Sequence, residues 1–256
     1  MSAALSRFAL HRYPAGAMTS STPAPRPFDL EGLLVQLEQG RKETVLATAE
    51  GGVVPFVLAT LRHRLGRPLV IVVPDVQRMT RMMEGLQTYE ASLWPGLAPV
   101  LAYEANDQSP YQEVAPLRAL SRQRVAAAWR VHNDFGIAAV VLTAEALMCR
   151  TLSAAVLDSH TVMTSIGSEL DRVELAEQLV RAGYERVPVV EDPGTFCVRG
   201  GVVDGWSPLY EEPVRVELFG DDVEGMRFFD LETQKASGTL VDLILPPARE
   251  LLLDPG

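Results

Sequence analysis

Short continuous runs of apolar residues, separated by segments with helical spacing, fill the first half of the chain and constrain its fold most strongly. The runs occur at residues 44–48, 69–73, 98–101 and 138–142. Runs of this kind are apolar on both faces, as are parallel strands that helices cover on both sides. Apolar residues recur at helical spacing in the segments between them, at 53–65, 76–88 and 117–131. The alternation predicts an α/β lobe with a doubly wound, mostly parallel sheet over residues 28–158.

The pattern changes after residue 158, where one amphipathic segment is followed mainly by strand-like segments. We expect a helix at 169–182, with Ser168 and Asp171 as a capping box and Gly183 as its stop. Alternating segments separated by Gly, Pro and Asp predict strands at 186–191, 195–200, 202–206, 214–219 and 223–230. This order predicts a smaller α+β lobe with an antiparallel sheet over residues 159–238.

The two ends of the chain have a different composition from the lobes. Residues 1–27 are rich in Ala, Ser, Thr and Pro, which predicts a disordered extension. Residues 239–256 are apolar again, and we expect them to begin a segment that returns to the first lobe. No apolar run approaches the roughly 20 residues of a membrane span. We therefore expect no membrane contact and a cytoplasmic location.

The charge of the chain argues against general binding to duplex DNA. Its formal net charge is −10, from 33 acidic and 23 basic residues. DNA binders without sequence preference obtain most of their affinity from Lys and Arg side chains that neutralise phosphates. A local arginine patch is still compatible with this composition: Arg118, Arg122 and Arg124 in the expected helix 117–131 either contact a phosphate backbone or form a solvated helix face. The acidic whole favours the solvated face.

The residue pattern gives little support for a metal site or for a catalytic nucleophile. The two cysteines, Cys149 and Cys197, are far apart and form no CxxC pair. The histidines are scattered without the spacing of metal ligands, at His11, His63, His132 and His160. No Ser/His/Asp or Cys/His pairing is recognisable. We expect no catalytic residues, no metal site and no cofactor in this chain.

Four segments of the second lobe, in order, resemble a known family. They are Gly183–Val187, Glu191–Asp204, Pro213–Asp221 and Phe229–Gln234. Together they resemble the second domain of bacterial transcription-repair coupling factors, and the related repair protein UvrB shares much of the pattern. A weaker resemblance extends back to Phe28. The chain is therefore identified as an N-terminal, UvrB-like module of that family, with a degenerate helicase-like first lobe.

Strand alternation places Arg215, Glu217 and Phe219 on one face of the expected strand 214–219. Residue types alone leave two interpretations open. Either the arginines are solvated and Phe219 covers a sheet edge, or arginine beside an aromatic forms a protein-binding hot spot. The resemblance favours the second, because it implies that Arg199, Arg215 and Phe219 contact the repair protein UvrA.

The first lobe departs from UvrB at the segment that matches the phosphate-binding loop of UvrB. Such a loop needs glycines that let backbone N–H groups approach the phosphates, a lysine, and a hydroxyl that binds magnesium. Here the residues are Glu50, Gly51, Gly52, Val53 and Val54. Valines replace the lysine and the hydroxyl, and Glu50 adds a negative charge. We expect no ATP binding, which favours a coupling factor over UvrB itself.

The resemblance implies a non-catalytic interaction module that recruits UvrA to RNA polymerase stalled at DNA lesions. It also implies a parent protein that is an ATP-dependent DNA translocase, with ATP and Mg²⁺ in motor domains outside this chain. Parts outside the chain would contact RNA polymerase and DNA, and the parent's C-terminal domain would cover the UvrA-binding surface. Two alternatives remain: a UvrB-like, ATP-binding helicase fragment of nucleotide-excision repair, and a module that only braces or inhibits the motor.

Overall fold

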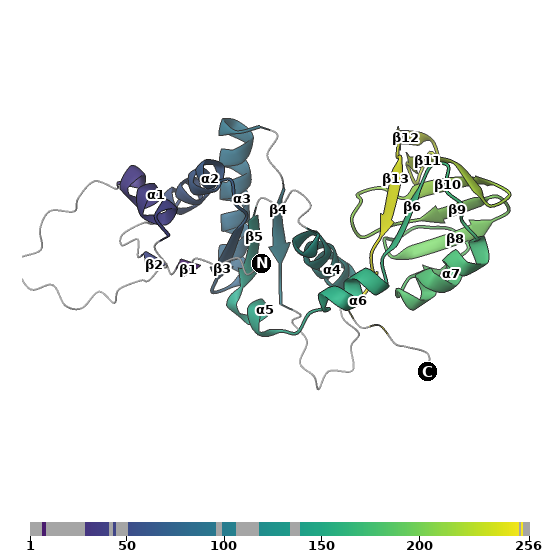
Figure 1. Cartoon of the computed structure of the whole chain (residues 1–256), viewed down its shortest axis with the longest axis horizontal. Helices are drawn as coiled ribbons and strands as arrows, with labels where there is room; N and C mark the ends of the chain where they lie inside the picture. Colours follow the sequence, from purple (N-terminus) through teal and green to yellow (C-terminus); the bar gives the residue numbers. More distant parts are fainter. Residues whose placement is uncertain are drawn as a thin grey trace, which may run out of the picture.

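The computed structural model consists of two lobes joined through the helices α4 (Arg118–His132) and α6 (Ala154–Ser159) (Figure 1). It describes residues 7–8, 29–40, 43–44, 51–95, 99–105, 118–133, 139–250 and 252. The first lobe contains a parallel sheet and the second contains antiparallel sheets. The chain is therefore a mixed α/β protein.

A three-stranded parallel sheet forms the centre of the first lobe. Its order is β3 (Leu69–Val73), β5 (Ala139–Thr143), β4 (Val100–Tyr103). Two helices pack on one face of this sheet, α2 (Val53–Leu65) and α3 (Val76–Leu93). The helix predicted at 53–65 has the bounds of α2, whereas α3 extends beyond the predicted end at residue 88. Asp75 caps α3 by accepting a hydrogen bond from the Arg78 backbone N–H at 2.8 Å.

The remaining elements of the first lobe are short. They are β1 (Arg7–Phe8), α1 (Leu30–Glu38), β2 (Glu43–Thr44) and α5 (Ala144–Met148). β1 pairs in parallel with β2 and lies within the N-terminal extension at residues 1–27, for which disorder stays a prediction. The rest of that extension, and most of the strand expected at 44–48, lie outside the described residues.

A six-stranded sheet forms the second lobe. Its order is β12 (Ala236–Thr239), β11 (Asp222–Phe229), β10 (Val214–Phe219), β9 (Val202–Gly205), β8 (Thr195–Arg199), β7 (Glu185–Arg186). The helix α7 (Arg172–Arg181) packs on one face of this sheet. A separate antiparallel pair, β6 (Val162–Ser165) and β13 (Asp242–Leu245), contributes to the same core.

Helix α7 begins later than its sequence pattern predicts. The capping box expected at Ser168 is wrong: Asp171 is the N-cap, and its carboxylate accepts hydrogen bonds from Val173 and Glu174 N–H at 2.7 and 3.0 Å. Those two backbone N–H groups hold the pKa of Asp171 below its usual value. Gly183 ends the helix with φ +85°, as its position predicts, because a residue with a left-handed backbone closes the last turn.

The strand expected at 186–191 is largely wrong. β7 ends at Arg186, and it runs parallel to β8. Pro188 has no N–H to donate, so the hydrogen-bonded ladder cannot continue through it. The carbonyl of Pro188 instead accepts a hydrogen bond from the Cys197 thiol at 3.1 Å.

Arginines of α4 tie the lobes together. Arg122 donates to the Pro193 carbonyl, and Arg130 donates to the Leu209 carbonyl at 2.9 Å. Arg124 is buried, with 1% of its surface exposed. The expectation that Arg122 and Arg124 lie on a solvated helix face is therefore wrong, because both guanidiniums bond within the molecule. The side chain of Arg118 lies outside the described residues.

Arg124 has partners on several sides. Its Nε donates to Glu250 Oε2 at 2.8 Å, and its Nη2 donates to the Tyr103 hydroxyl at 3.0 Å. The guanidinium carbon lies 4.2 Å from the centre of the Tyr103 ring, and Nη1 donates to the Glu104 carbonyl. The Glu250 backbone N–H also donates to Ser121 Oγ at 3.2 Å. The segment expected to return to the first lobe thus forms β13 in the second lobe and reaches α4 at Glu250.

We expect Arg124→Ala to lower the free energy of unfolding by about 3 kcal/mol, because it removes a buried cation from the partly buried Glu250 carboxylate. Urea unfolding followed by circular dichroism measures this change. Arg78→Ala is the matched control, since Arg78 is about half exposed and pairs only loosely with Asp75 at 3.7 Å. That control should cost less than about 0.5 kcal/mol. Equal losses in both variants would contradict the role given to Arg124.

Candidate functional site

The central strand β10 has one face in the core and one face turned outward. Val214, Val216 and Leu218 are buried in the cluster that contains α7. Arg215 and Glu217 are half-buried and Phe219 is exposed. The alternation predicted for this strand is confirmed. Because α7 covers the inner side of the sheet, polar side chains of neighbouring strands meet on the outer side.

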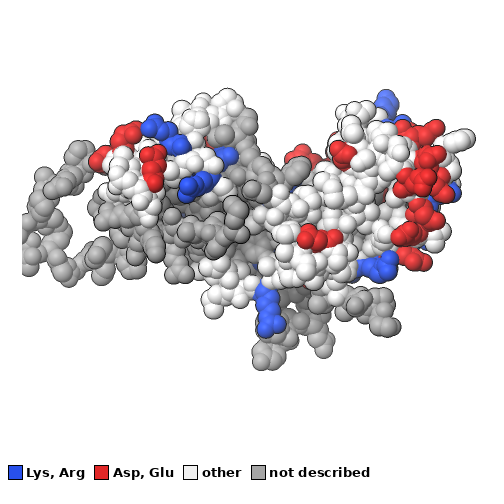
Figure 2. All heavy atoms as spheres, in the orientation of Figure 1, with Lys and Arg blue, Asp and Glu red and all other residues white. Residues whose placement is uncertain are grey.

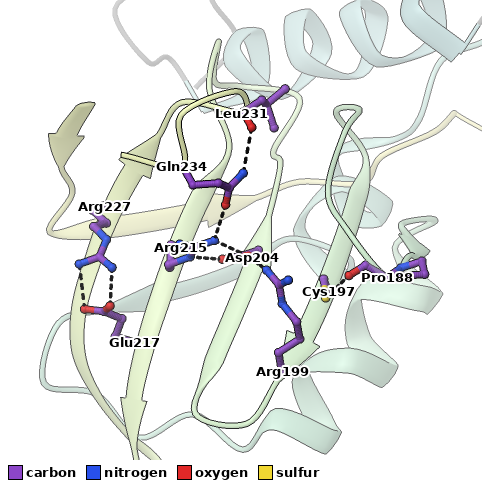
Figure 3. Close-up of polar contacts among 9 residues, drawn as sticks. All are labelled: Pro188, Cys197, Arg199, Asp204, Arg215, Glu217, Arg227, Leu231 and Gln234. Atoms are coloured by element: carbon purple, nitrogen blue, oxygen red, sulfur yellow. Dashed lines mark hydrogen bonds and ion pairs between the residues drawn. The ribbon is translucent and has the colours of Figure 1, made fainter. Parts of the chain in front are cut away.

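A carboxylate between two guanidiniums forms the centre of the outer face (Figure 3). Asp204 of β9 lies directly opposite Arg215 of β10 in the strand register. Arg215 donates to both carboxylate oxygens, from Nε at 2.7 Å and from Nη2 at 2.9 Å. Arg199 of β8 donates from Nη2 to Asp204 Oδ2 at 2.7 Å. Asp204 is only 2% exposed, and its charge is compensated by this pair of cations.

Arg215 is held by two further groups. Its Nη2 also donates to Gln234 Oε1 at 3.0 Å, and its guanidinium carbon lies 4.5 Å from the centre of the Phe229 ring. The hydrogen bonds to Asp204 raise the pKa of Arg215 above its usual value. Only 16% of the Arg215 side chain is exposed, whereas 51% of the Arg199 side chain is exposed. The two arginines therefore differ in what they can offer to a partner.

Gln234 has a left-handed backbone, with φ +57°, which is uncommon for a residue with a side chain. Its Nε2 donates to the Leu231 carbonyl at 3.0 Å, which leaves Oε1 for Arg215. The loop that carries it is closed by Asp230, whose carboxylate accepts from Thr233 N–H at 2.8 Å. That N–H is the main reason why the pKa of Asp230 is lowered. The loop thus fixes an amide oxygen above the sheet.

A second ion pair lies beside the first on the same face (Figure 3). Arg227 of β11 is the register partner of Arg215, and its side chain bonds to Glu217. The two bonds run from Nη2 to Oε1 at 2.6 Å and from Nη1 to Oε2 at 3.3 Å. This pair is electrically balanced, so it does not offset the one positive charge that remains where Arg199 and Arg215 share Asp204.

Phe219 is the last residue of β10 and is 73% exposed. Gly220 follows it with φ +64°, which allows the chain to turn into β11. Arg199 shares a register row with Val202 and Glu217, so Phe219 lies two residues beyond that row and two strands away. Ordinary sheet spacings place the Cα atoms of Arg199 and Phe219 about 12 Å apart.

The turn between β8 and β9 depends on two glycines. Gly200 has φ +57°, and its carbonyl accepts from Arg172 of α7 at 2.8 Å. At Gly201, a Cβ atom would lie 2.8 Å from the Leu218 carbonyl oxygen of β10. Only glycine lets these backbones approach so closely.

The structure brings the three residues predicted for protein binding onto one face of one sheet. Two details of the alternative interpretation do not hold: Arg215 is paired with Asp204 rather than solvated, and Phe219 stands on a central strand rather than on a sheet edge. Arg199 is about half-exposed, as that interpretation expects, and the binding role of the three residues stays a prediction. The sequence interpretation missed Asp204 and Gln234. An aspartate inside the strand 202–205 was a usable signal, since Asp is depleted in strands and a buried one needs cations. Gln234 had no such signal.

The segment matching a phosphate-binding loop is described from Gly51 onward, and Glu50 lies outside the described residues. Gly51 has φ +61°, and Gly52 precedes the first residue of α2 without a side-chain cap. Val53 is half-exposed, and Val54 packs partly against the core of the first lobe. Neither valine can neutralise a phosphate or bind magnesium.

We expect no binding of a labelled ATP analogue at concentrations up to about 1 mM in the presence of Mg²⁺, because the loop lacks its cation. Equilibrium fluorescence anisotropy measures this. The comparison is the double variant Val53→Lys with Val54→Ser, which restores the ammonium and the hydroxyl of a phosphate-binding loop. Submillimolar affinity of the unchanged chain would instead support a UvrB-like helicase fragment.

Every helix among the described residues is too short or too polar to span a membrane. Within the same residues, no group of three or more His, Cys, Asp or Glu side chains is placed to hold a metal ion.

The region that contains this face matches a known family model. Residues 162–251, which include the whole outer face, match the family model of the UvrB interaction domain. Transcription-repair-coupling factors are similar over most of the chain: that of Myxococcus xanthus is 39% identical over 77% of this chain, and that of Bacillus subtilis (strain 168) is 28% identical over 89%. The Escherichia coli (strain K12) factor is 24% identical over 83% of the chain. The chain spans 16%, 19% and 18% of the lengths of these relatives.

Proposed function

We propose, from the premise that this chain is a UvrB-like module of the transcription-repair-coupling factor family, that its second lobe docks the nucleotide-excision-repair protein UvrA. Arg199, Arg215 and Phe219 form the docking site, and the module itself carries out no catalysis. The observation that carries this proposal is the outer face of the sheet. It presents guanidiniums and an exposed benzyl ring on a rigid, core-backed platform.

The composition of this face suits a protein partner. Arginine and aromatic residues are enriched among the few residues that dominate binding energy at protein interfaces. A ring that is 73% exposed in the free chain can lose most of that exposed apolar surface on docking, which supplies a hydrophobic driving force. The guanidiniums make the interaction directional, because their planar set of N–H donors matches the geometry of a carboxylate.

The surrounding charge supports an acidic contact on the partner at this particular place. Figure 2 shows acidic side chains gathered at the outer end of the second lobe, with Lys and Arg in separate small areas. The whole chain carries a formal charge of −10. A partner with carboxylates is repelled by most of this surface and attracted where Arg199 is exposed, so charge selects the register of docking.

The role of the whole protein follows from the same premise. The parent protein recruits UvrA to RNA polymerase stalled at DNA lesions, and its motor domains, with ATP and Mg²⁺, lie outside this chain. Contacts with RNA polymerase and DNA also belong to those other parts. The C-terminal domain of the parent covers the docking face until the motor engages its substrate.

We expect Arg199→Glu to weaken UvrA binding about 30-fold or more, because it puts a negative charge against the partner's carboxylates. Phe219→Ala should weaken binding about tenfold by removing the apolar anchor. Isothermal titration of each variant with UvrA measures both effects.

The matched controls lie on α7, on the opposite side of the sheet. Arg181→Glu makes the same charge change at an exposed position, and Val173→Ala truncates a side chain that is 70% exposed. Both controls should bind within about twofold of the unchanged chain, since they are remote from the site. Equal binding by the site variants and the controls would refute the site, and no UvrA binding by the unchanged chain would favour a module that only braces the motor.

A further inference from the structure

Asp204 is a buried carboxylate that accepts three hydrogen bonds from arginines and leaves a partner little surface to contact. Both of its oxygens bond to Arg215, and Oδ2 also accepts from Arg199. With 2% of its surface exposed, it cannot form much of a docking surface itself. Its effect on any partner must therefore pass through the arginines.

The two arginines have different donor edges left. A guanidinium has five N–H donors, arranged as two edges that can each hold a carboxylate. Asp204 occupies the Nε–Nη2 edge of Arg215, and Gln234 accepts from the remaining Nη2 donor. The Nη1–Nη2 edge of Arg215 therefore no longer has two donors for a carboxylate. Arg199 gives one donor to Asp204, so among the described residues at least one of its edges stays free.

The charges of Arg199, Arg215 and Asp204 do not cancel. Two guanidiniums share one carboxylate, which leaves one formal positive charge unmatched. The adjacent Glu217–Arg227 pair is neutral and cannot supply the missing anion. The exposed side chain of Arg199 is where an additional carboxylate can reach the group.

From these observations we infer that Asp204 and Gln234 are positioning residues, which lock Arg215 in place and orient Arg199 so that its free edge receives a single carboxylate of the partner. This inference rests on the proposed docking of UvrA and assigns separate roles within it. Arg199 makes the charged contact, Arg215 acts mainly through Asp204, and Phe219 supplies the apolar contact. Orienting the guanidinium before binding reduces the side-chain entropy lost on docking.

The first test is a double-mutant cycle measured by titration with UvrA. Asp204→Asn keeps the shape of the side chain and removes its charge, and we expect it to weaken binding about tenfold in the unchanged background. In the Arg199→Ala background the same change should alter affinity less than about twofold, because the group that it orients is gone. In the Phe219→Ala background it should keep its full effect. A loss of the same size in all three backgrounds would indicate general damage to the fold and overturn the inference.

A second variant decides the matter even where Asp204→Asn fails to fold. Gln234→Gly removes the amide that holds Arg215, and glycine accepts the positive φ of this position without strain. We expect the midpoint of thermal unfolding to stay the same or rise while UvrA binding weakens about threefold. Glu217→Gln, which changes the other carboxylate of the face, is the matched control and should bind within about twofold. Binding by Gln234→Gly as tight as that of the unchanged chain would contradict the positioning role.

The results also separate this inference from the docking proposal. If the unchanged chain binds UvrA and Phe219→Ala weakens it, while Asp204→Asn and Gln234→Gly have no effect, only the positioning role fails. If the unchanged chain does not bind UvrA, both fail.

Discussion

The guanidinium of Arg124 sets the main constraint on how the lobes are joined. A cation with 1% of its surface exposed must find its partners inside the molecule, and none of the neighbouring segments could supply them alone. Tyr103 and Glu104 come from the end of a strand in the parallel sheet, and Glu250 comes from the tail that leaves the second lobe. The burial of one charge thus ties together segments that are more than a hundred residues apart in the sequence.

The two faces of the six-stranded sheet in the second lobe have different roles. The inner face is a continuous apolar core with α7, which leaves the strands little freedom to move. The outer face carries ion pairs whose partners come from four different strands, so their geometry follows from the strand register. Such a face is formed before any partner arrives. Rigid, preformed surfaces lose less entropy on binding than loops that must first become ordered.

Features that depend on local sequence were the ones the sequence predicted well. Apolar spacing gave the bounds of α2, and strand alternation gave the two faces of β10. The helix cap was misplaced by three residues, because Ser168 and Asp171 are both good caps, and the Ser168 hydroxyl instead bonds back to Thr164 and Ser165 of β6.

Features that depend on how the strands pair could not be predicted from local sequence. Asp204 meets Arg215 only because β9 and β10 pair in one register, and Gln234 reaches them from a loop beyond the next strand. Arg122 and Arg124 were expected in solvent because the chain as a whole is acidic, whereas their partners include Pro193 and Glu250, which the local pattern of α4 does not contain.

The contact between Gly201 and the Leu218 carbonyl has a consequence for how the docking face can evolve. A side chain at residue 201 would push β10 away from the turn that follows β8, since its first carbon would lie only 2.8 Å from a backbone oxygen. Arg199 lies two residues before Gly201, and Phe219 lies one residue after Leu218. The distance between the Arg199 guanidinium and the Phe219 ring therefore depends on residue 201 having no side chain. Any lineage that keeps this spacing must keep that glycine, even though its contact is with its own chain.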